Sequence, residues 1–191
     1  SIFNTANQLE EDATFRYVYD ANGNQIRKTN KTTGELTQFE YDAENKLARV
    51  VSNGKAVNYK YDGLGRRVEK EVVDVTTTTT RFIYDNEDIV AEYDGSNRIL
   101  ATYVHGPGID EPIYMERGGQ KYYYHADGLG SITELTNSSG TVVQTYKYDA
   151  FGNIIAQTGT LVNPFTYTGR EFDPESGLYY YRRRYYDPNI G

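Results

Sequence analysis

The sequence predicts an all-β protein built as an antiparallel array of short hairpins. Three observations lead to this fold class. A turn that opens with Asp recurs about every 20 to 24 residues, a second turn containing Gly falls about halfway between its copies, and side chains alternate in character between turns. No segment carries a sustained helical pattern, so each turn is expected to join two strands.

The recurring turn starts with an aromatic residue followed by Asp. The Asp side chain is expected to accept a hydrogen bond from the backbone two residues on. Gly or Asn three residues after the Asp can adopt the left-handed conformation that closes a hairpin loop. Residues 84–88 and 93–97 are read as further copies, with Asp88 as the poorest match. The residues assigned to this structural turn are Asp20, Gly23, Asp42, Asn45, Asp62, Gly65, Asp127, Gly130, Asp149, Gly152, Asp173, Gly177 and Asp187.

The second turn is marked by dipeptides that end in Gly34, Gly54, Gly140 and Gly159. Between turns, residues of similar character recur at every second position, which is the period of a strand. The pattern predicts roughly 14 to 18 short strands and almost no helix. Residues 178–186 are expected to form a single C-terminal strand.

Composition agrees with a hairpin array and excludes several functions. The chain has 191 residues, 20 Tyr, no Cys and a net charge of −7. Tyr is expected to supply much of the buried apolar area, with its hydroxyl seeking a partner. The absence of Cys excludes disulfides and thiolate metal sites. The acidic balance disfavours nucleic-acid binding, and no apolar run is long enough to predict a membrane span.

No catalytic, cofactor-binding or metal-binding residue is predicted. Asp173 and Asp187 could be read as a carboxylate pair for acid–base chemistry, but both stand in the turn position, and the structural interpretation is favoured. The three consecutive Arg residues 182–184 lie among tyrosines, which favours cation–π packing on a strand over stacking on bases.

Metal binding is disfavoured for similar reasons. His105 and His125 stand alone, without the further ligands of a zinc site, so packed strand residues are the favoured reading. The acidic loops at residues 10–12 and 85–88 lack the ligand spacing of an EF-hand, so solvated turns are expected there.

Four ordered blocks resemble the Rhs-repeat-associated core of Rhs proteins. They are residues 122–131 (YYYHADGLGS), 148–153 (YDAFGN), 165–171 (FTYTGRE) and 177–188 (GLYYYRRRYYDP). The earlier Tyr-Asp turns are similar to the YD repeats of the same proteins, and residues 3–9 look like a decayed copy of 41–47. The resemblance implies that residues 1–121 form a YD-repeat array and that residues 122–191 form a core-like segment continuous with it.

The resemblance also implies a function. In Rhs proteins, toxin-complex C subunits and teneurins, YD repeats wind a β-sheet into a hollow shell, and in the bacterial toxins the shell encloses a C-terminal toxin. The expected role is therefore a non-enzymatic structural module of a secreted or cell-surface bacterial protein. Its expected partners are the remainder of its own shell and an attached polypeptide cargo. Because the family core usually continues beyond a block like residues 187–191, the chain is expected to be a fragment of a larger shell.

Two other functions stay open on the sequence. Exposed Tyr near Asp and Asn suits stacking on sugar rings, so an extracellular adhesion or carbohydrate-binding module with a glycan ligand is one alternative. The other is a self-assembling extracellular fibre subunit, because strands at the two ends of a sheet can pair with another copy.

Overall fold

The computed structural model describes residues 1–191 and contains nineteen strands and one short 3₁₀ helix. The all-β prediction is confirmed, and the strand number slightly exceeds the expected range. The strands are β1 (Ile2–Phe3), β2 (Leu9–Glu11), β3 (Phe15–Tyr19), β4 (Gln25–Asn30), β5 (Leu36–Tyr41), β6 (Leu47–Ser52), β7 (Lys55–Tyr61), β8 (Arg67–Val73), β9 (Thr77–Asp85), β10 (Asp88–Asp94), β11 (Ile99–His105), β12 (Pro112–Arg117), β13 (Gln120–Ala126), β14 (Ile132–Asn137), β15 (Val142–Tyr148), β16 (Ile154–Thr158), β17 (Glu171–Asp173), β18 (Leu178–Tyr181) and β19 (Arg184–Tyr186).

Strands β1 to β16 follow one another in sequence order within one sheet, and β17 to β19 form a separate three-stranded sheet. This order is what consecutive hairpins produce, because each strand pairs with the one before and the one after it. The hairpins at the Asp turns carry a shift of register next to the loop, as between Val18 and Tyr19 where β3 pairs with β4. Such a bulge accommodates the left-handed residue of the loop.

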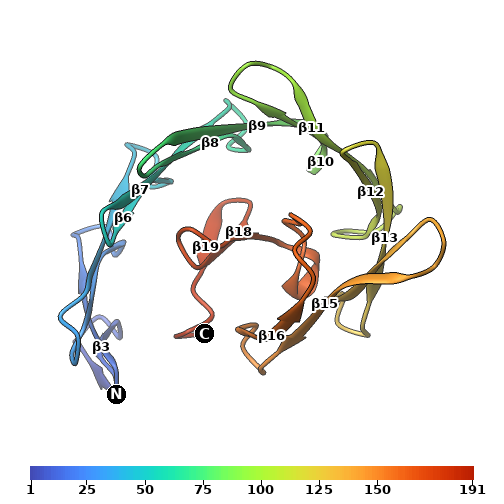
Figure 1. The fold of residues 1–191 in the computed structure, drawn as a ribbon. Helices are drawn as coiled ribbons and strands as arrows, with labels where there is room; N and C mark the ends of the chain where they lie inside the picture. The colour runs from blue at the N-terminus through green and yellow to red at the C-terminus, as the bar shows by residue number, and fades with distance from the viewer. The chain divides into compact units, whose positions relative to one another are not determined.

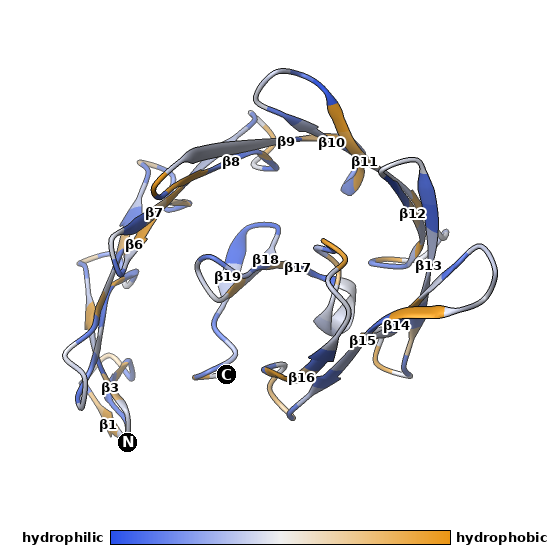
Figure 2. Ribbon diagram, viewed as in Figure 1, coloured by the Kyte–Doolittle hydropathy of each residue, from blue (hydrophilic) through white to orange (hydrophobic).

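The chain divides into two compact units. The first comprises residues 1–60 and 70–78, and the second comprises residues 61–69 and 79–191. In the first unit, the buried side chains include Tyr17, Phe39, Val50 and Tyr59, which alternate along their strands with exposed residues. Figure 2 shows hydrophobic and hydrophilic residues interspersed along the strands. No helix is long and apolar enough to cross a membrane.

The second unit has its own core, to which its C-terminal segment contributes. The core includes Phe82, Tyr103, Met115 and Leu135 from the sheet, and Phe165 from the segment that follows β16. The ring of Phe165 meets that of Tyr103 edge-on at 5.1 Å. Within this unit, the segment with β17 to β19 lies on the inner side of the curve described by β9 to β16 (Figure 1).

Three expectations about local structure are wrong. Gly159 does not join two strands of a hairpin, because β16 pairs only with β15 and no strand follows it directly. Residues 178–186 form two strands, β18 and β19, because Arg182 has a φ of 56° and starts a tight turn between them. Residues 84–88 form a two-residue hairpin in which Asp85 pairs with Asp88 and Asn86 has a φ of 52°. The residue three positions after Asp85 is Asp88, which is neither Gly nor Asn. The left-handed conformation is instead adopted by Asn86, directly after Asp85.

Candidate functional site

The Asp turn has one hydrogen-bond pattern that recurs along the chain. Oδ1 of Asp20 accepts from the backbone N–H groups of Asn22 at 2.9 Å and Asn24 at 2.8 Å. The Gly23 N–H donates to the Asp20 carbonyl oxygen at 3.1 Å. The same Oδ1 pattern holds the loops at Asp42, Asp62, Asp94, Asp127 and Asp149. One side-chain oxygen thus satisfies two backbone donors that the hairpin ladder leaves unpaired.

The residue three positions after the Asp adopts the left-handed conformation. Its φ is 86° at Gly23, 83° at Gly65, 85° at Gly130 and 90° at Gly152, with 58° at Asn45. Around Asp20 and Asp149, side-chain hydrogen bonds from Asn24 and Asn153 and further backbone N–H bonds lower the pKa of the carboxyl group. The loop therefore favours the charged form of the Asp that holds it.

Two further loops use Asn in place of Asp. Oδ1 of Asn4 accepts from the N–H groups of Ala6 and Gln8, both at 2.9 Å. Oδ1 of Asn137 accepts from those of Ser139 and Thr141 at 3.0 and 3.1 Å. The first of these is the decayed copy at residues 3–9. The second is the turn predicted at Gly140, and the role of the Asn137 side chain in it was not predicted, although an Asn followed three residues later by Gly would have indicated it.

Asp173 and Asp187, which could be read as an acid–base pair, have different surroundings. Oδ1 of Asp187 accepts from the Asn189 N–H at 2.9 Å, while the Gly191 N–H donates to the Asp187 backbone carbonyl at 3.2 Å. The Asp173 turn is closed by its backbone carbonyl, which accepts from Gly177 N–H at 2.8 Å. The Asp173 side chain is buried and forms an ion pair with Arg67.

The tyrosine of the Tyr-Asp unit has a hydrogen-bonding role that the sequence did not reveal. The Tyr41 hydroxyl donates to the Gln25 carbonyl at 3.1 Å, and the Tyr84 hydroxyl donates to the Arg67 carbonyl at 2.9 Å. In each pair, the acceptor is the first strand residue after the preceding Asp turn.

The same contact is found elsewhere along the chain. It joins the Tyr19 hydroxyl to the Leu9 carbonyl, the Tyr148 hydroxyl to the Ile132 carbonyl, and the His105 ring to the Ile89 carbonyl. Burial raises the pKa of Tyr41 to about 12 and raises the pKa of Tyr84 as well.

A buried Arg67 joins the sheet of the second unit to its C-terminal segment. Only 1% of its side chain and 2% of that of Asp173 are exposed. The guanidinium lies 4.5 Å from the ring centre of Tyr180 and 5.0 Å from that of Phe82. Its backbone N–H donates to the Tyr180 hydroxyl at 2.9 Å. The Arg67 charge is therefore buried beside an opposite charge and aromatic faces that stabilise a cation.

A second set of charges holds the same segment. Asp110 accepts from the guanidinium of Arg170 at 2.5 Å and from that of Arg182 at 2.9 Å. Glu171 is also buried, and this burial raises the pKa of its carboxyl group. These contacts explain the bend at Arg182, because its side chain is directed back to Asp110.

The expectation of packed histidines is met by His105, which is partly buried in the second unit, and is wrong for His125, which is exposed on β13. The His105 ring meets Phe165 edge-on at 5.3 Å. The His125 ring bonds the Thr136 hydroxyl at 2.9 Å. No group of three or more His, Asp or Glu side chains is placed to hold a metal ion.

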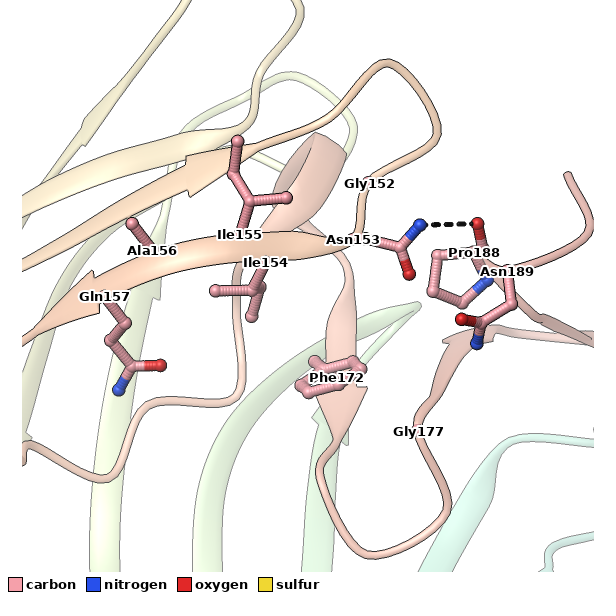
Figure 3. Close-up of a pocket in the computed structure, with 10 residues that line it drawn as sticks. All are labelled: Gly152, Asn153, Ile154, Ile155, Ala156, Gln157, Phe172, Gly177, Pro188 and Asn189. Atoms are coloured by element: carbon pink, nitrogen blue, oxygen red, sulfur yellow. Dashed lines mark hydrogen bonds between the residues drawn. The ribbon is translucent and has the colours of Figure 1, made fainter. Parts of the chain in front are cut away.

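A trough of about 500 Å³ runs beside β16 in the second unit. One wall is formed by residues 152–157, and the other by Phe172, Gly177, Pro188 and Asn189. Figure 3 shows Ile154 between β16 and Phe172, and a hydrogen bond of 2.9 Å from the Asn153 amide to the Pro188 carbonyl. None of the lining side chains is charged.

Comparison with known proteins places these features in a family. A family model described as teneurin YD-shell matches residues 2–191. The tRNA3(Ser)-specific nuclease WapA of Bacillus spizizenii is 34% identical over 197 residues, which cover 99% of this chain and 8% of that protein. Toxin protein Tse5 of Pseudomonas aeruginosa is 28% identical over 224 residues, covering 97% of this chain and 17% of Tse5.

The fold is also found in a solved structure. The TcdB2–TccC3 crystal structure aligns with a TM-score of 0.62 and 18% identity, covering 93% of this chain and 12% of the other. At this identity, the likeness concerns the fold alone. Because the family model covers nearly the whole chain, the protein is a structural shell module and belongs to the teneurin YD-shell family.

Proposed function

We propose that this chain is a non-enzymatic part of a YD-repeat β-shell that encloses an attached C-terminal toxin. In this role, residues 1–121 serve as the repeat array and residues 122–191 as the core-like segment. The remainder of the same shell and the polypeptide cargo are its partners. The protein acts as a secreted or cell-surface component of a bacterium.

One observation carries the non-enzymatic role. The polar groups that recur along the chain bond the chain's own backbone, as the Asp62 carboxylate does for Leu64 and Arg66 at 2.9 and 3.0 Å. Asp173, which a catalytic reading would need, is buried against Arg67. Groups engaged in this way stabilise loops and packing, and they do not face a substrate.

The cargo role is supported by the relatives. One is named a tRNA nuclease and another a toxin, and this chain spans only 8% and 17% of their lengths. In the proposed role, the nuclease or toxin activity for which those relatives are named belongs to parts outside the segment that matches this chain.

The purified chain provides a direct test of the non-enzymatic role. Incubated with tRNA, it should leave the RNA intact, and it should not fragment on prolonged storage. Cleavage of tRNA would contradict the proposal. So would self-cleavage that Asp173→Asn or Asp187→Asn abolishes.

The enclosing role needs a protein that contains this chain together with its cargo. Limited proteolysis should spare the cargo while the shell is folded and digest it once the shell is opened by denaturant. Digestion of the cargo at the same rate in both conditions would contradict enclosure.

A further inference from the structure

The sheet ends at β16 with an open edge. Strand β16 is last in the sheet order and pairs only with β15. In an antiparallel pair, alternate residues direct their N–H and C=O groups away from the partner strand. Residues Ile154–Thr158 therefore present a row of donors and acceptors that no other strand of the chain takes up.

This edge lacks the usual protection against pairing. Exposed edges in soluble proteins commonly carry Lys, other charges or Pro. The sequence of β16 is Ile-Ile-Ala-Gln-Thr, with no charged residue and no Pro. Ile155 is 65% exposed on this strand. An unguarded edge with an exposed branched side chain is suited to pairing with a further strand.

The trough lies beside the same strand, so the edge and the trough form one feature. Its walls offer the apolar side chains of Ile154 and Phe172 and the amides of Gln157 and Asn189. Figure 3 shows the trough bounded by β16 on one side and by the segment around Pro188 on the other. Five residues in a strand extend about 17 Å, so β16 can pair with a segment of about that length.

We propose that the β16 trough binds an extended, uncharged polypeptide segment, which adds to the sheet as a further strand. Only a backbone in strand conformation matches a row of alternating donors and acceptors along its whole length. The absence of charged side chains in the walls favours an uncharged segment, because a charge placed there would lose solvation without an ionic partner. This site goes beyond enclosure of a cargo, since it assigns a peptide-binding function to one edge.

The test uses the 191-residue chain and a dye-labelled heptapeptide of alternating Thr and Val, acetylated and amidated at its ends. Fluorescence anisotropy should show saturable binding. A peptide of the same sequence with N-methyl groups at alternate residues should bind at least about tenfold more weakly, because it has lost backbone donors. Hydrogen–deuterium exchange should slow at Ile154–Thr158 when the unmodified peptide is bound.

Two variants locate the site. Ile155→Lys should weaken binding by about tenfold, since an edge Lys opposes strand addition. Ile99→Lys is the matched control, because Ile99 is 62% exposed on β11, which is paired on both sides. It should leave the affinity within about twofold of the unchanged chain.

Several results would overturn the proposal. These are no binding at the solubility limit of the peptide, equal binding of the N-methylated peptide, or unchanged exchange at β16 in the bound state. Equal weakening by the two Lys variants would do the same. Self-association of the chain that Ile155→Lys abolishes would assign the edge to a second copy instead.

Discussion

The Asp, Gly and Tyr of the repeated unit each make a structural contribution that depends on their position in the unit. At six of the Asp turns the Asp side chain holds its own loop, as Asp127 does by accepting from Leu129 and Ser131. The Gly that follows provides a backbone conformation that other residues adopt at a cost. In four units the Tyr before the Asp bonds a backbone carbonyl of the preceding repeat. One short unit therefore contains both a local and a longer-range contact.

The loop at residues 127–131 offers a matched pair of glycines. Gly130 has a φ of 85°, while Gly128 is outside the left-handed region, and neither is crowded at the position of an added Cβ. Gly130→Ala should lower the free energy of unfolding by about 1 kcal/mol, and Gly128→Ala should leave it nearly unchanged. Urea denaturation measures both. Equal effects would show that the loop does not depend on the left-handed residue.

Substitution of Gly152 should cost stability in two ways, through the strained backbone conformation and through a steric clash. Its φ is 90°, and a Cβ there would collide with the ring of Tyr167. Gly152→Ala should therefore destabilise the protein more than Gly130→Ala in the same urea experiment. A smaller effect at Gly152 would mean that Tyr167 moves aside freely.

The tyrosine contact can be tested without removing the ring. Tyr84→Phe deletes the hydroxyl that donates to the Arg67 carbonyl, and it should cost about 1 kcal/mol of unfolding free energy. Tyr123→Phe is the control, because the Tyr123 ring packs on Tyr114 and its hydroxyl bonds no protein atom. If the two variants were equally stable, the repeated hydroxyl contact would have no net stabilising effect.

At the scale of elements, the C-terminal segment of the second unit is fixed to the sheet by both backbone and charge. The Ile132 N–H donates to the Thr166 carbonyl at 2.9 Å, and the Tyr179 hydroxyl donates to the Gly152 carbonyl at 2.7 Å. The ion pair of Arg67 and Asp173 is also buried and adds a contact between opposite charges. The three strands β17 to β19 are too short to be stable alone, so these attachments hold them in place.

Breaking the buried ion pair should release this segment. Asp173→Asn leaves the Arg67 charge buried without its partner, and loss of such a partner costs about 3 to 5 kcal/mol. Glu40→Gln is the control, because the pair of Glu40 and Arg49 is largely exposed and should contribute little. Urea denaturation gives the stability of both variants. Limited proteolysis should find cleavage between residues 161 and 191 in Asp173→Asn only, and a segment that stays resistant would contradict the anchoring role.

At the scale of the whole molecule, the abundance of tyrosine predicts sensitivity to alkali. Burial raises the pKa of Tyr41 to about 12, against about 10 in an unfolded chain. The fold therefore favours the neutral phenol. This contribution to stability is complete below pH 10 and is lost as the pH rises through 12.

Titration followed by tyrosinate absorbance should show this. A first group of tyrosines should ionise near pH 10, and a second should ionise above pH 11 together with loss of the β-sheet circular dichroism signal. Tyr41→Phe has no phenol to ionise at this position. Its free energy of unfolding should therefore fall less between neutral pH and about pH 12 than that of the unchanged chain. Ionisation of all tyrosines in one step near pH 10 with the fold intact would contradict the prediction.

Association between copies through sheet edges stays a prediction at this scale. The structure changes the residues expected to take part, since residues 178–186 fold into β18 and β19, and β1, at the other end of the sheet order from β16, is the edge expected to pair with another copy. Light scattering over a range of concentrations measures association, and a monomer throughout would contradict it.

The amino-acid sequence determined the features of this protein that depend on neighbouring residues. Asp, Gly and Asn at fixed spacing specify the loops, and the period of two specifies the strands, because both act over a few residues. The tertiary structure alone decided which distant groups meet. Arg67 and Asp173 are 106 positions apart, and no periodicity links them. The Asp173 side chain binds Arg67, and residues 178–186 bend at Arg182, because contacts with Arg67 and Asp110 outweigh the local preferences for an Asp loop and a continuous strand.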